Sequence, residues 1–152
     1  MKRTLAEEPR LASRAFFPHW RSAIVRHSDL DPNAHVTNSV FTAWLDDGRY
    51  ALLTEALRPL MAPDDALALA SITVDFAREV GFADAPEIGT AVLRLGTSAI
   101  VMGQGLFVGA ACVATALSVT VVMDGRIRRA RPLDPRERDA LAGFAGPAAD
   151  WS

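Results

Sequence analysis

Acidic, amide and histidine side chains are concentrated in residues 28–49, which read SDLDPNAHVTNSVFTAWLDDGR. Asp31 stands in a loop-forming stretch with Pro32 and Asn33, and His35 follows four residues later. A helix is expected to begin a few residues further on. The first N–H groups of a helix have no intrahelical acceptor and can stabilise an oxyanion, while a nearby carboxylate can attack a carbonyl or activate water. The segment is therefore typical of acyl transfer or hydrolysis without a catalytic serine or cysteine.

The helix that follows this loop is predicted over residues 39–58, with Asn38 or Ser39 as its N-cap and Pro59 after its end. Its apolar residues share one broad face, as expected for a helix that packs on a core. Gly48 lies in the middle of this face, where it costs about 1 kcal/mol of helix propensity. Its position predicts that a strand or a second helix approaches the backbone closely there.

The remaining elements are predicted to be strands and one short helix. Alternating, β-branched segments predict strands over 20–27, 66–78, 87–95, 100–108 and 110–123. Asp134 and Pro135 are expected to start a C-terminal helix. The fold class is therefore α+β, with a five-stranded antiparallel sheet and one long helix. Because one helix cannot cover both faces of such a sheet, an apolar face is expected to remain for an oligomer.

The domain organisation follows from the same pattern. We expect a flexible arm over residues 1–14, a single domain over 15–145 and a C-terminal tail over 146–152. The chain has 152 residues, half of them apolar, and a net charge of -2, which is untypical of nucleic-acid-binding or disordered proteins. It begins without a secretory signal and contains no apolar run long enough for a membrane span, so we expect a cytoplasmic protein with no membrane partner.

The loop and the helix together resemble the hotdog-fold acyl-CoA thioesterases, in the branch of 4-hydroxybenzoyl-CoA thioesterase. That branch has a loop D-x-D-x-x-G-H-V-N-N, then an aromatic residue and E-x-x-R on the helix. Residues 29–38 read DLDPNAHVTN, with Ala34 in place of the glycine and Thr37 in place of the first asparagine. Phe41, Asp46 and Arg49 occupy the positions of the aromatic residue, the glutamate and the arginine.

The resemblance implies a hotdog fold, in which the sheet wraps around the long helix, and a thioester hydrolase. It implies that Asp31 is the nucleophile or the general base and that the backbone N–H of Phe41 polarises the thioester carbonyl. The substrate would be an acyl-CoA or acyl-carrier-protein thioester, with coenzyme A as part of the substrate and no separate cofactor. The family further implies a homodimer or homotetramer whose active site is shared between subunits.

Several other residues are weaker candidates. His35 either assists catalysis or only forms hydrogen bonds, Asn38 either caps the helix or contacts substrate, and Asp29 is expected to bond loop amides or to pair with Arg26. A relative of the family with its catalytic carboxylate on the helix leaves Asp47 and Glu55 as alternatives. A cluster of arginines either protects a strand edge or binds the phosphates of coenzyme A. This cluster comprises Arg126, Arg128, Arg129 and Arg131.

Two other functions remain open at this stage. A hotdog hydratase or dehydratase would use Asp31 and His35 on an enoyl or hydroxyacyl thioester. A non-catalytic acyl-CoA-binding protein would have kept the fold and lost the rate, and the departures at Ala34 and Thr37 permit this. The three histidines of the chain do not have metal-ligand spacing with cysteine or carboxylate clusters, so no metal site is expected.

Overall fold

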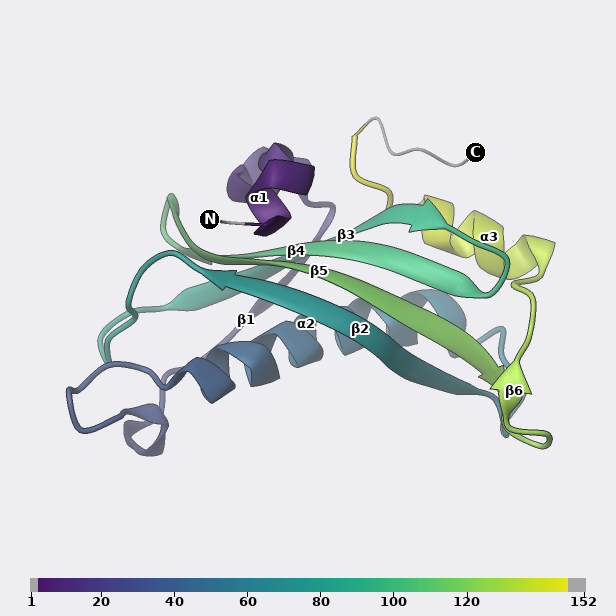
Figure 1. Cartoon of the computed structure of the whole chain (residues 1–152), viewed down its shortest axis with the longest axis horizontal. Helices are drawn as coiled ribbons and strands as arrows, with labels where there is room; N and C mark the ends of the chain where they lie inside the picture. The colour runs from purple at the N-terminus through teal and green to yellow at the C-terminus, as the bar shows by residue number, and fades with distance from the viewer. Residues whose placement is uncertain (1–2, 148–152) are drawn as a thin grey trace.

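A curled antiparallel sheet dominates the computed structural model, which describes residues 3–147 (Figure 1). The strands follow the order β1-β3-β4-β5-β2, and β6 pairs with the end of β5. The four long strands lie within two residues of the predicted bounds at each end, whereas the first strand is shorter than predicted and β6 was not predicted. The strands are β1 (His19–Ser22), β2 (Ala66–Phe76), β3 (Pro86–Leu95), β4 (Ala99–Val108), β5 (Ala111–Asp124) and β6 (Arg129–Ala130).

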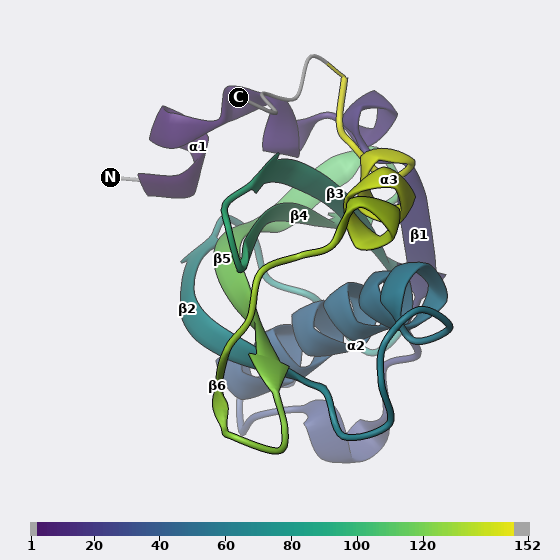
Figure 2. The same cartoon turned by 90° about the vertical axis from the view of Figure 1, so that its right-hand side faces the viewer.

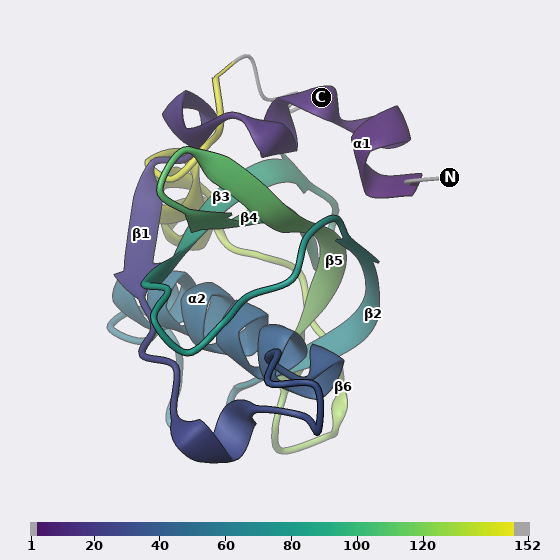
Figure 3. The same cartoon turned by 90° about the vertical axis from the view of Figure 1, so that its left-hand side faces the viewer.

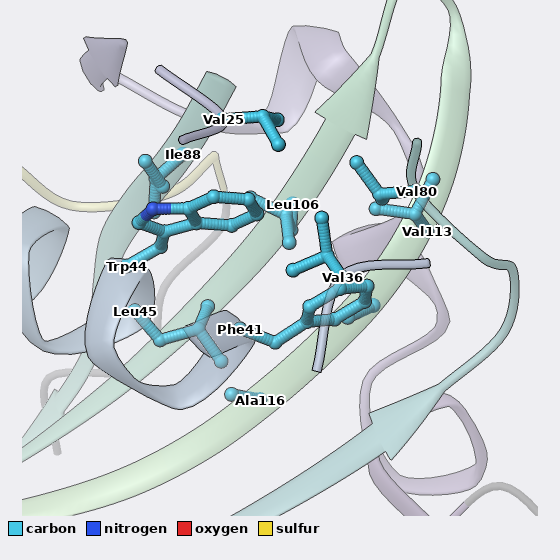
Figure 4. Packing of buried hydrophobic residues seen from close by; sticks show 11 residues of the cluster. Val25, Val36, Phe41, Trp44, Leu45, Val80, Ile88, Leu106, Val113 and Ala116 are labelled. Carbon is cyan, nitrogen blue, oxygen red and sulfur yellow. The ribbon is translucent and has the colours of Figure 1, made fainter. Parts of the chain in front are cut away.

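The long helix α2 (Asn38–Leu57) packs against one face of the sheet, which confirms the predicted α+β, hotdog arrangement (Figure 1). Phe41 and Trp44 point from its first turns toward the strands, and their rings stack with centroids 5.9 Å apart (Figure 4). A Cβ atom at Gly48 would lie 2.5 Å from Cγ2 of Ile88 on β3. The close approach predicted at this glycine is therefore confirmed, and its partner is a strand.

The N-terminal segment covers part of the opposite face of the sheet, as Figures 1 and 2 show. This segment forms α1 (Arg3–Glu7) and the short 3-10 helices η1 (Pro9–Ala12) and η2 (Arg14–Phe16). Leu11 is fully buried there. The stretch predicted as a flexible arm thus contributes core residues, and it covers part of the sheet face that was expected to stay open. The packing of this segment could not be predicted from the sequence, because short 3-10 helices do not produce a long periodic pattern of apolar residues.

The C-terminal helix α3 (Pro135–Ala142) begins where it was predicted, beside the sheet (Figure 2). The Asp134 carboxylate accepts a hydrogen bond from the Glu137 N–H at 2.8 Å, as an N-cap does. After the helix, the Gly146 N–H donates to the Val92 carbonyl on β3 at 3.1 Å. Of the tail predicted over 146–152, residues 148–152 lie outside the described residues. No described helix is both long and apolar enough to cross a membrane.

One edge of the sheet is formed by β2, which pairs with β5 along one side. Its sequence, ALALASITVDF, has Asp75 as its one charged residue. Leu69 and Phe76 are exposed on it although both are large and apolar. A long apolar edge of this kind can pair with another strand, so β2 is the element through which this fold could bind a second copy.

Candidate functional site

The loop of residues 29–37 is closed by backbone hydrogen bonds just before α2 (Figure 3). The Thr37 N–H donates to the Asp29 carbonyl at 2.9 Å, and the Asp31 N–H donates to the His35 carbonyl at 2.8 Å. Leu30 and Val36 form an antiparallel bridge between these two bonds. The loop therefore leads directly from the candidate carboxylate to the first turn of the helix.

The Asp31 carboxylate is partly exposed and is oriented by this loop. Its Oδ1 accepts hydrogen bonds from the N–H groups of Asn33 at 2.9 Å and His35 at 3.1 Å. No hydrogen bond from a residue between 3 and 147 reaches Oδ2. One oxygen thus holds the loop, while the other is available to a water molecule or to a carbonyl carbon.

Ala34 adopts a left-handed backbone conformation, with φ of 62°. Glycine reaches this region without a penalty, whereas a residue with a Cβ atom pays about 1–2 kcal/mol. The N–H groups on both sides, of Asn33 and His35, bind the Asp31 carboxylate. The loop thus keeps a conformation suited to glycine although alanine stands there, at a cost in stability.

Asp29 has a structural role, as predicted. Its side chain is 2% exposed, and it accepts hydrogen bonds from the Arg26 N–H at 2.8 Å and from the Arg26 guanidinium at 2.9 Å. These bonds hold the pKa of the Asp29 carboxyl below its usual value. The charged carboxylate therefore anchors the start of the loop.

Thr37 is the N-cap residue of α2, so the prediction of Asn38 or Ser39 at that position is wrong. The Thr37 side chain makes no capping bond, and the Val40 N–H donates to the Thr37 carbonyl at 2.9 Å. The backbone N–H groups of Asn38 and Ser39 donate to no described backbone carbonyl. Both residues are exposed, so these two N–H groups can donate hydrogen bonds to a negatively charged oxygen of a ligand.

Phe41, whose N–H was the predicted oxyanion donor, is the fourth residue of α2. Its side chain is 2% exposed and contacts Phe76 on β2, with ring centroids 5.6 Å apart. Its N–H belongs to the first turns of α2, as do those of Asn38 and Ser39, so these three N–H groups are the candidate oxyanion donors.

His35 lies beside the loop carboxylate in sequence but forms its side-chain contact elsewhere. Its Nε2 is 3.1 Å from Oε2 of Glu79, which follows β2. The imidazole is 40% exposed. This contact supports the interpretation of His35 as a hydrogen-bonding residue that ties the loop to the end of β2.

A buried polar network under α2 was missed by the sequence reasoning. Arg49 is 2% exposed and pairs with Asp46, and its Nη1 donates to Oε1 of Gln104 at 3.3 Å. The Gln104 amide donates in turn to the Leu45 carbonyl at 2.8 Å and to Thr90 at 3.1 Å. The sequence feature that could have predicted this network is the glutamine, Gln104, within the otherwise apolar strand predicted over 100–108. The network fixes α2 on the sheet.

The predicted phosphate-binding arginines lie far from the loop. Arg126, Arg128 and Arg129 are exposed at the turn between β5 and β6, at the opposite end of the long axis from the loop (Figure 1). The intervening helix has 20 residues, a length of about 30 Å. Arg131 bonds Asp65 and the buried Glu137 instead. One chain therefore does not bring this cluster to Asp31.

Asp47 and Glu55, the alternative candidates for a catalytic carboxylate on α2, lie away from the loop in sequence and on the helix surface. Glu55 lies 3.3 Å from Nε2 of His19, and Asp47 is exposed on the outer face of α2. Within residues 3–147 no three His, Cys, Asp or Glu side chains converge as metal ligands do.

The fold and the loop together define a hotdog-fold thioesterase-like protein. The profile of the thioesterase-like superfamily matches residues 25–141, so the chain belongs to this superfamily. No protein of curated function matches the sequence.

Solved structures agree with this assignment. The PA5185 protein of Pseudomonas aeruginosa strain PAO1 is 26% identical with a TM-score of 0.80, and the match covers 90% of this chain and 97% of that one. A thioesterase from Thermus thermophilus, in complex with coenzyme A and Zn, is 27% identical with a TM-score of 0.72 over 83% of this chain and 93% of that one. The 1,4-dihydroxy-2-naphthoyl-CoA thioesterase of Synechocystis is 17% identical with a TM-score of 0.71, over 82% and 95%, and shows the fold alone.

Proposed function

We propose that the protein hydrolyses an acyl- or aroyl-CoA thioester to a free acid and coenzyme A. The observation that carries the proposal is the Asp31 carboxylate, which N–H groups hold in the loop that leads directly into the free N–H groups at the start of α2. A thioester carbonyl gains negative charge when it is attacked, and N–H groups at a helix start stabilise that charge. The membership in the thioesterase-like superfamily supports the same reaction.

Two routes are compatible with this arrangement. In the first, Oδ2 of Asp31 takes a proton from water, the water oxygen bonds the carbonyl carbon, and the carbon–sulfur bond breaks as the proton passes to the thiolate. In the second, Oδ2 itself attacks and the thiolate leaves; water then attacks the Asp31 carbonyl carbon of the mixed anhydride, which releases the acid and restores the carboxylate. A single turnover in ¹⁸O-labelled water separates the routes, because only the second leaves label in the Asp31 carboxylate.

The test is thiol release from a panel of thioesters, from short to long aliphatic acyl-CoAs together with benzoyl- and phenylacetyl-CoA. We expect Asp31→Asn to lose about 100-fold or more in kcat, because an amide neither takes a proton nor attacks. The amide oxygen can still accept the bonds from Asn33 and His35, so the loop is retained. Asp139→Asn is the matched control, since Asp139 is exposed on α3.

Full activity in Asp31→Asn, or no thiol release from any thioester by the wild-type protein, would contradict the proposal. A change in double-bond absorbance without thiol release would then indicate the hydratase alternative. Binding of acyl-CoA without turnover, unchanged in Asp31→Asn, would indicate a non-catalytic acyl-CoA-binding protein.

We also propose that the active unit is a homodimer or a larger homo-oligomer assembled through β2. The exposed apolar side chains of Leu69 and Phe76 on this edge strand support an interface with a second copy. Phe76 also contacts Phe41 in the first turns of α2, so an interface at β2 would border the candidate site.

A further inference from the structure

A groove runs along the solvent-facing side of α2, with β1 and the residues that follow it as its other wall. It consists of two hollows that share Arg21 and Asp47 and are therefore continuous. The first hollow begins at Ser39, in the turn of α2 that carries the free N–H groups. The second reaches as far as Glu55.

The two hollows differ in chemistry. The first has a mixed lining, in which the apolar side chains of Ile24, Val40 and Trp44 alternate with polar and charged ones. The second contains Tyr50, whose ring is half exposed, and the carboxylates of Asp47 and Glu55. The first hollow thus suits a chain that has both methylene and amide groups, and the second suits a flat ring that carries hydrogen-bond donors.

The junction of the hollows holds a cation that is available to a ligand. Arg21 is exposed, and no hydrogen bond or ion pair connects its side chain to another described residue. Arg26, also in the first hollow, is already bound to Asp29, and His19 in the second is already beside Glu55. Arg21 is therefore the group in this groove best able to bind a phosphate.

We propose that this groove binds the coenzyme A part of the substrate, an inference that rests on the proposed function. The thioester lies at the N–H groups of Asn38 and Ser39, and the pantetheine arm, with its methylene and amide groups, follows the first hollow. The diphosphate binds Arg21, and the adenine stacks on Tyr50, since aromatic side chains bind bases through their faces. Asp47 and Glu55 accept hydrogen bonds from the adenine amino group and the ribose 2′-hydroxyl, and the 3′-phosphate points away from these carboxylates into solvent.

The dimensions of the helix fit this order of groups. Asp47, opposite Arg21, lies eight residues after Ser39, which is about 12 Å along the helix axis. The turn that carries Arg128 lies beyond the end of α2, about 30 Å from the first turn. Within one chain, Arg21 is thus near enough to bind a diphosphate attached to the pantetheine arm. The arginine turn, which is the β5–β6 turn with Arg126, Arg128 and Arg129, is too far away.

The test is isothermal titration calorimetry of the protein, which measures the Kd for coenzyme A and for pantetheine. Pantetheine lacks the phosphates and the nucleoside. We expect Arg21→Ala to weaken coenzyme A binding about tenfold or more, as the loss of a charged hydrogen bond does, and to leave pantetheine binding unchanged. Arg128→Ala is the matched control, an equally exposed arginine whose removal should change neither Kd. Tyr50→Ala should also weaken coenzyme A binding, and Tyr50→Phe should retain it.

Loss of coenzyme A affinity in Arg128→Ala with none in Arg21→Ala would overturn the inference and assign the phosphates to the arginine turn of another subunit. Equal loss for coenzyme A and pantetheine in Arg21→Ala would also overturn it, because the effect would not come from the phosphates. These outcomes do not depend on turnover. A wild-type protein that hydrolyses acyl-pantetheine but binds no coenzyme A would refute the groove and leave the proposed reaction standing.

Discussion

The conformation of Ala34 makes the substitution Ala34→Gly a quantitative test of the catalytic loop. At φ of 62° an alanine costs about 1–2 kcal/mol relative to an allowed conformation. Glycine removes this cost but adds about 0.5–1 kcal/mol of backbone entropy to the unfolded chain. The balance is a gain in the free energy of unfolding of about 0.5–1 kcal/mol, because the loop hydrogen bonds to Asp31 do not involve the Ala34 side chain.

The assay is urea unfolding of the wild-type protein and two variants, Ala34→Gly and Ala43→Gly. Ala43 is an exposed residue inside α2, where the same substitution should cost about 1 kcal/mol. The two variants should therefore shift the urea midpoint in opposite directions. If Ala34→Gly destabilises the protein as much as Ala43→Gly does, Ala34 does not adopt the left-handed conformation and the account of the loop is wrong.

Two further predictions concern the loop anchor and the sheet edge. Because bonds from Arg26 lower the pKa of Asp29, its charge stabilises the fold above the unfolded pKa of about 4, and that contribution is lost as the pH falls through the lower folded value. Asp29→Asn should therefore be less stable than wild type at pH 7 and approach it near pH 3 in urea unfolding, and a constant difference would contradict this role. Leu69→Lys places a charge on the β2 edge and should convert the proposed oligomer to a monomer in light scattering and remove activity, whereas Ile127→Lys, at an exposed isoleucine of the β5–β6 turn, should do neither. An intact oligomer in Leu69→Lys would place the interface elsewhere.

Much of the fold was predictable because its signals are local. The helix over 38–57 and the four long strands follow from the spacing of apolar residues, and the helix start at Asp134 and Pro135 follows from residue type. Gly48 predicted the contact with β3, because a glycine in a helix lowers its stability and is expected in a buried face only where a neighbouring element packs closely. The candidate carboxylate, Asp31, was also predicted from the motif around it.

The sequence by itself therefore determined the order of the long helix and the long strands, the motif that resembles the thioesterase family, and the candidate carboxylate. Only the tertiary structure decided which backbone N–H groups are free, because that depends on the bond from Thr37 to Asp29 across the loop. It also decided that Arg49 is buried, since its partner Gln104 is 55 residues away, and that the N-terminal segment packs on part of the outer sheet face. Such contacts join residues that are distant in the chain, and no local period or propensity encodes them.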